Sequence, residues 1–166
     1  MKYLKAGAAF LVAFLLQGSL LNMFSIAGHT PNLLLALVVM MSFLYEKEMI
    51  GITYGALFGL IYDMCFCDIL GPTAIAFVIT SACVLIMRYY ANVENIISMS
   101  VVSIIAFLIF YIAHWGLMTF AGNTIGLGYV LLNSILTMIY TLVINIVIYK
   151  VLIKSVVKHH KDRYFI

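Results

Sequence analysis

Two long runs of the sequence contain no Lys, Arg, Asp or Glu, and they constrain the fold more than any other feature. They cover 6–45 and 95–149. Only 9% of the residues are charged and 66% are hydrophobic, whereas a soluble domain averages about 25% charged residues. A small domain has too much surface to hide so many apolar side chains from water. We therefore predict an all-α, polytopic membrane protein, because the apolar runs are continuous and do not alternate as barrel strands do.

Each charge-free run is too long for a single crossing, since about 20 apolar residues span the hydrocarbon core. Polar segments that contain glycine, 25–32 and 121–128, divide the two runs. In the first segment, Thr30 followed by Pro31 predicts a helix start, because threonine caps helices and proline suits the first turn. We expect one integral-membrane domain, 1–166, with six transmembrane helices at about 6–25, 31–45, 49–66, 72–88, 97–120 and 128–152.

The basic residues predict how this bundle is oriented. Six crossings would place every Lys and Arg on one side of the membrane, while the loops at 25–31, 67–72 and 121–127 carry none. Positive charge marks the cytoplasmic side, so both termini are expected there. The last basic residues are Lys150, Lys154, Lys158, Lys161 and Arg163. They either only set this orientation, or also bind anionic membrane lipids or a cytoplasmic partner. The net charge of +3 is too small to indicate nucleic acid.

A row of small residues in the third expected helix raises the question of packing. Gly51, Gly55 and Gly59 lie four residues apart and form two overlapping G-x-x-x-G motifs. Residues at this spacing stay on one face of a helix, and glycine there lets two helix backbones approach closely in a membrane. We interpret the row as a helix-packing or partner interface. The alternative is that glycine is simply common in membrane helices.

Asp63 continues the same four-residue spacing. If the helix begins near Met49, Asp63 lies about 21 Å further along its axis, in the outer part of the bilayer. It is either a buried polar anchor or partner contact, or a carboxylate at the helix end that reaches water. If it is buried, a hydroxyl, amide or backbone N–H must satisfy it, or it stays protonated.

No pattern in the sequence predicts catalysis or cofactor binding. The stretch "DMCFCD" at 63–68 has metal-ligand residue types without a recognised metal spacing. Motifs of serine hydrolases, zinc proteases and nucleotide-binding loops are missing, and His114 has no evident partner for base catalysis. We expect no catalytic residue, no cofactor and no metal, and therefore not an enzyme.

Two stretches resemble the family of the rod shape-determining protein MreD. These are "HTPNLLLALVV" at 29–39 and "GITYGALFGLIYDMCFCDILGPTAIAF" at 51–77. The shared pattern is a proline and Asn/Asp before a leucine-rich helix, then a glycine-spaced helix that ends near an aspartate, then a glycine at the next helix start. Many members have aspartate where this chain has Asn32. The residues that the resemblance assigns to a packing or partner interface are Gln17, Pro31, Asn32, Gly55, Gly59, Asp63 and Gly71. Gly51 is predicted to join them from the four-residue spacing alone.

The resemblance implies a function that composition cannot supply. It implies a non-enzymatic scaffold of the cell-wall elongation machinery, in the bacterial cytoplasmic membrane and needed for rod shape. Its expected partner is an MreC-like bitopic membrane protein, with indirect links to MreB-like actin, a glycan polymerase and a class B transpeptidase.

The MreD family also looks similar in fold to the substrate-binding subunits of energy-coupling-factor vitamin transporters. This likeness provides the alternative function, in which Ala9 and Ala13 would form a small-residue coupling surface. The loops at 25–31 and 121–127 offer few groups to hold a vitamin, so we favour the scaffold.

Overall fold

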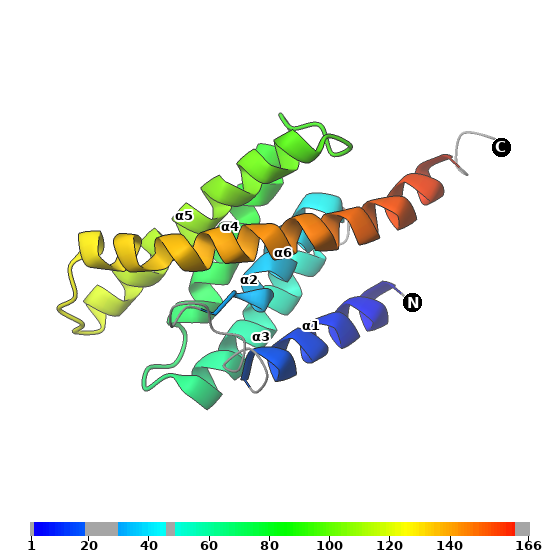
Figure 1. Ribbon diagram of the computed structural model, residues 1–166. Helices are drawn as coiled ribbons and strands as arrows, with labels where there is room; N and C mark the ends of the chain where they lie inside the picture. Colours follow the sequence, from blue (N-terminus) through cyan, green and yellow to red (C-terminus); the bar gives the residue numbers. More distant parts are fainter. Residues whose placement is uncertain (1, 19–29, 46–48, 162–166) are drawn as a thin grey trace.

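The computed structural model describes residues 2–18, 30–45 and 49–161, with the backbone alone for Lys2 and for 154–161. The described residues form six helices and no strand, which confirms the all-α prediction. Figure 1 shows their arrangement. The helices are α1 (Lys2–Gly18), α2 (Leu33–Leu44), α3 (Ile50–Phe66), α4 (Pro72–Arg88), α5 (Ile96–Phe120) and α6 (Leu127–Lys161).

Three helix ends differ from the expected bounds. α1 begins at Lys2 instead of residue 6, and the part of it expected at 19–25 lies outside the described residues. The helix start predicted at Thr30 and Pro31 is wrong, because the cap of α2 is Asn32. α6 continues to Lys161 instead of ending near 152, since no glycine or proline follows to stop it.

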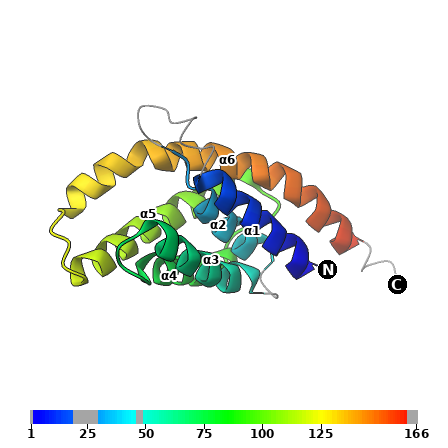
Figure 2. The same cartoon turned by 90° about the horizontal axis from the view of Figure 1, so that it is seen from below.

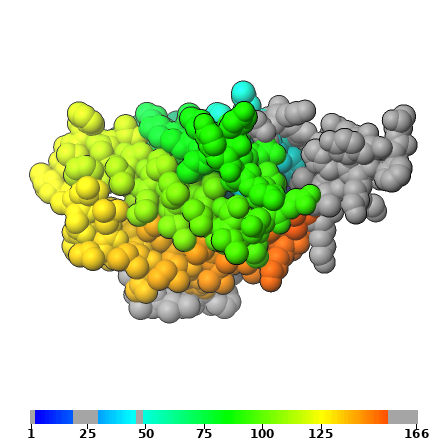
Figure 3. All heavy atoms as spheres, turned by 90° about the horizontal axis from the view of Figure 1, so that it is seen from above, coloured from blue at the N-terminus to red at the C-terminus, as the bar shows by residue number. Residues whose placement is uncertain are grey.

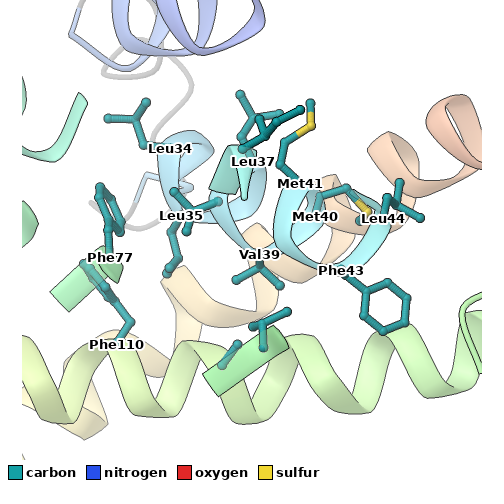
Figure 4. Close-up of a cluster of buried hydrophobic side chains, with 14 of the residues drawn as sticks. Leu34, Leu35, Leu37, Val39, Met40, Met41, Phe43, Leu44, Phe77 and Phe110 are labelled. Atoms are coloured by element: carbon teal, nitrogen blue, oxygen red, sulfur yellow. The ribbon is translucent and has the colours of Figure 1, made fainter. Parts of the chain in front are cut away.

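α2 is the central element of the bundle, because it contacts each of the other five helices. All of its residues from Leu34 to Leu44 are buried. Figure 4 shows how they divide: Leu34 and Leu37 point toward α1, whereas Val39 and Phe43 point toward α5. A helix that is apolar on every side must be enclosed by other helices or by lipid, and here the helices enclose it.

The remaining helices pack around α2, and helices that follow one another in the sequence contact each other. α3 packs on α4, α4 on α5 and α5 on α6, while α1 packs on α2 and α3. α1 and α6 run roughly antiparallel, so the start of α1 and the end of α6 lie at the same end of the molecule (Figures 1 and 2). Figure 3 shows one face of the molecule, where α5 and α6 lie side by side.

The outer surface of the bundle is strongly apolar. Among the described residues, two helical segments are long and apolar enough to cross a membrane, Ile96–Phe120 and Leu127–Ile153. In the most apolar 18-residue stretch of each segment, only 33% and 17% of the residues, respectively, are buried inside the protein. An exposed apolar surface of this extent requires a membrane or a protein partner to cover it.

Candidate functional site

The three spaced glycines lie where α3 approaches its two neighbours in the bundle. A Cβ added to Gly51 would lie 2.9 Å from the carbonyl oxygen of Val38 in α2. At Gly59 it would lie 2.6 Å from Cα of Ala74 in α4, while at Gly55 it would meet the Val38 side chain at 3.2 Å. The row therefore faces helices of the same chain, and glycine is what permits the close backbone approach.

Asp63 lies at the end of this row and is fully buried, with 0% of its surface exposed. Its Oδ2 atom accepts hydrogen bonds from the backbone N–H groups of Gly71 and Thr73, both at 3.0 Å, and of Ala74 at 3.4 Å. These groups belong to the cap and first turn of α4, whose N–H groups have no partner within the helix. A side chain of α3 thus caps the N-terminus of α4.

The start of α4 explains why a distant carboxylate is needed there. Its cap residue, Gly71, has no side chain to accept a hydrogen bond and adopts a left-handed conformation with φ of 110°. A Cβ at Gly71 would meet nothing within 4 Å, so this glycine serves the turn and not close packing. The carboxylate also faces the positive end of the α4 dipole. Its second oxygen, Oδ1, is buried without a hydrogen-bond partner among the described residues.

A second polar contact extends the Asp63 site to α5. The hydroxyl of Thr73 lies 3.4 Å from Nε2 of His114, and the imidazole stacks on the ring of Phe110 with 5.7 Å between centroids. Through Thr73, whose backbone binds Asp63, the site connects α3, α4 and α5. His114 is therefore a packed, half-buried residue with a hydroxyl neighbour.

Gln17 and Asn32 form a separate polar set that connects α1, α2 and α6. The Asn32 Oδ1 atom accepts from the N–H of Leu35 at 2.9 Å, as an N-cap does. Gln17 donates to the same oxygen at 3.4 Å and accepts from the N–H of Leu34 at 3.1 Å. The backbone N–H of Asn32 donates to the hydroxyl of Thr141 in α6 at 3.0 Å. An uncharged amide therefore suffices at position 32, since its role here is to cap a helix and join it to two others.

Within the described part of the chain, the other predicted residues make no side-chain hydrogen bond within these two sets. Pro31 is buried immediately before the cap of α2. Lys150 is exposed on α6, about three turns before the helix ends. The side chains of Lys154, Lys158 and Lys161, and all of Arg163, lie outside what the structure describes.

The thiol of Cys67 lies beside the Asp63 site, just after α3 ends. Burial raises the pKa of this thiol, and the Asp63 carboxylate raises it further because it disfavours a second negative charge nearby. No three His, Cys, Asp or Glu side chains gather as a metal site within the described ranges.

Three contact residues, Thr73, His114 and Thr141, were not predicted as members of a site. The sequence pattern around Thr73 could have identified it, because Thr73 follows a glycine and a proline at a helix start near an aspartate. No local pattern identifies Thr141, since its contact with Asn32 joins residues 109 positions apart.

The fold and this site define a class of protein: an apolar helical bundle of the membrane type, in which buried polar groups bind neighbouring helices together. The family model of the rod shape-determining protein MreD matches residues 3–159. The chain belongs to the MreD family, a family of rod shape-determining membrane proteins, which confirms the resemblance drawn from 29–39 and 51–77. No curated protein and no solved structure matches the chain.

Proposed function

We propose that the chain is a non-enzymatic scaffold of the bacterial cell-wall elongation machinery and that it binds an MreC-like bitopic membrane protein. The observation that carries this proposal is the family match over 3–159, nearly the whole chain. A match of this extent includes both polar sets and all or nearly all of each helix, so the proposal does not depend on one motif.

We also propose that the bundle crosses the bacterial cytoplasmic membrane six times, with both termini in the cytoplasm. The distribution of Lys and Arg supports this topology. α2 has only 12 residues and rises about 18 Å, which is short for a crossing. Since the other helices enclose it, its ends need not face lipid, and backbone outside a helix is tolerated where protein surrounds it.

In this topology both polar sets lie toward the outer surface. Asp63 is near the end of α3 and Gln17 near the end of α1, while Asn32 caps the start of α2. All three side chains are used within the chain, so we propose that they fix the shape of the surface that the partner contacts. Substitutions there are expected to weaken partner binding through the bundle and not by removing a direct contact.

The chemistry of Asp63 supports a scaffold over an enzyme. A general base must lie within reach of a substrate proton. The side chain of Asp63 has no exposed surface, and its Oδ2 atom accepts three backbone N–H groups of the neighbouring helix, so its observed contacts are those of a helix cap. The likeness in fold to substrate-binding subunits of energy-coupling-factor transporters stays a prediction.

Copurification tests the partner directly. The tagged chain, extracted from its own host in mild detergent, should retain an MreC-like bitopic protein. Asp63→Ala should reduce the amount retained, whereas Asp68→Ala, at an exposed loop carboxylate, should not. Recovery of soluble transporter ATPase subunits in place of an MreC-like protein would contradict the proposal.

A further inference from the structure

An apolar groove runs between α1 and α6, with α2 as its floor. α1 packs on α2 and α3, whereas α6 packs on α2 and α5, which leaves a cavity of about 370 Å³ open to the surroundings. Small side chains of α1 form one wall. The lining residues are Ala8, Ala9, Val12, Ala13 and Leu16 of α1, Leu33 and Leu37 of α2, and Ile148 of α6.

One end of this groove carries a positive charge on its α1 wall. Lys5 is exposed and precedes Ala8 and Ala9 by three and four residues, so it shares the face of α1 that lines the groove. On α6, exposed Lys150 follows Ile148 by two residues, which places it on a different face of its helix. Long lysine side chains extend along apolar surface toward charged groups at the interface. The groove is thus apolar along its length and cationic at one end.

The lining and the charge of the groove indicate its occupant. All lining side chains are apolar, which excludes a polar solute. The groove is open to the surroundings, so a flexible acyl chain can lie along the apolar lining while its headgroup reaches Lys5. In the proposed topology, the cationic end faces the inner leaflet, where anionic phospholipids are concentrated.

We propose that this groove binds one anionic phospholipid, with an acyl chain along α1 and the headgroup phosphate at Lys5. The inference rests on the proposed membrane topology, because that topology places Lys5 at the inner leaflet. It does not depend on the partner or on a role in cell shape, so lipid binding can fail while those proposals stand.

Native mass spectrometry of the purified full-length protein tests the site. The protein in mild detergent is titrated with phosphatidylglycerol or with phosphatidylcholine of the same acyl chains. We expect one phosphatidylglycerol to bind before any phosphatidylcholine. Lys5→Gln should weaken the binding of that lipid about fivefold, the effect of one lysine near an anionic surface, whereas Lys150→Gln should weaken it less.

A groove-filling variant gives a second, independent readout. Ala8→Leu adds bulk at an exposed position and should reduce the binding of both lipids while the thermal unfolding midpoint is unchanged. Equal affinity for the two lipids, or equal effects of Lys5→Gln and Lys150→Gln, would overturn the proposal. It would also be overturned if a photo-crosslinker at Val12 captured a partner protein in cells and no phospholipid.

Discussion

Replacing Gly59 by alanine tests whether the close approach of α3 to α4 holds the bundle together. The new Cβ would lie 2.6 Å from Cα and 2.9 Å from N of Ala74. α4 would have to move by roughly 1 Å to restore a carbon–carbon separation of about 3.5 Å. Because both atoms belong to the backbone, no side-chain rotation relieves the clash.

The size of the effect follows from two opposing contributions. Overpacking of a well-packed core costs about 1–3 kcal/mol, and alanine regains about 0.5–1 kcal/mol over glycine inside a helix. The net loss in free energy of unfolding is therefore about 1–2 kcal/mol, a five- to thirtyfold change in the unfolding equilibrium. The required shift of α4 would also strain the hydrogen bond from Ala74 N–H to Asp63.

This loss is measured by heating the protein in detergent and determining the fraction that stays folded by size-exclusion chromatography. We expect Gly59→Ala to lower the midpoint by about 2–8 °C. Gly116→Ala in α5 is the matched control, since a Cβ there meets nothing within 4 Å, and its midpoint should stay the same or rise. Equal midpoints for the two variants would refute the reasoning that backbone contact at Gly59 stabilises the bundle.

Three further predictions follow from the Asp63 site and the topology. Asp63→Ala should lower the free energy of unfolding by about 2 kcal/mol, because two buried N–H groups and one part-buried N–H group lose their acceptor. Asp68→Ala, at an exposed site, should change it by less than about 0.5 kcal/mol. With Cys67 as the sole cysteine, Asp63→Asn should speed maleimide labelling at neutral pH, since loss of the carboxylate lowers the pKa of the thiol and increases its thiolate fraction. Glu94 and Asn123 lie at exposed loop positions. In a cysteine-free background, Glu94→Cys and Asn123→Cys should react with a membrane-impermeant maleimide from opposite sides of the membrane. Labelling of both from the same side would contradict six crossings.

Much of the fold could be predicted from where the sequence lacks charge. The lengths of the runs without Lys, Arg, Asp or Glu indicate how many helices each run contains. Glycine or proline marks several of the helix ends. The start of α2 was misplaced because Thr30 and Asn32 are both good caps, and a single sequence does not show which one the chain uses. In the structure Asn32 also binds Gln17 and Thr141, so tertiary contacts decide the choice.

The candidate site was only partly predictable, for a geometric reason. The four-residue spacing of Gly51, Gly55 and Gly59 identifies one face of a helix, but it carries no information about which helix that face meets. The acceptor role of Asp63 depends on backbone N–H groups of Gly71 and Thr73, and every residue except proline has such a group. Residue identity therefore does not reveal this kind of partner.

Cell shape after depletion tests the central claim most directly. Depleting this chain in its own bacterial host and imaging the cells should show that rods become round, which re-expression of the wild-type chain should reverse. Vitamin uptake, measured in the same cells, should be unaffected. Rod-shaped cells with normal growth after complete depletion, or rods that lose only vitamin uptake, would contradict the account.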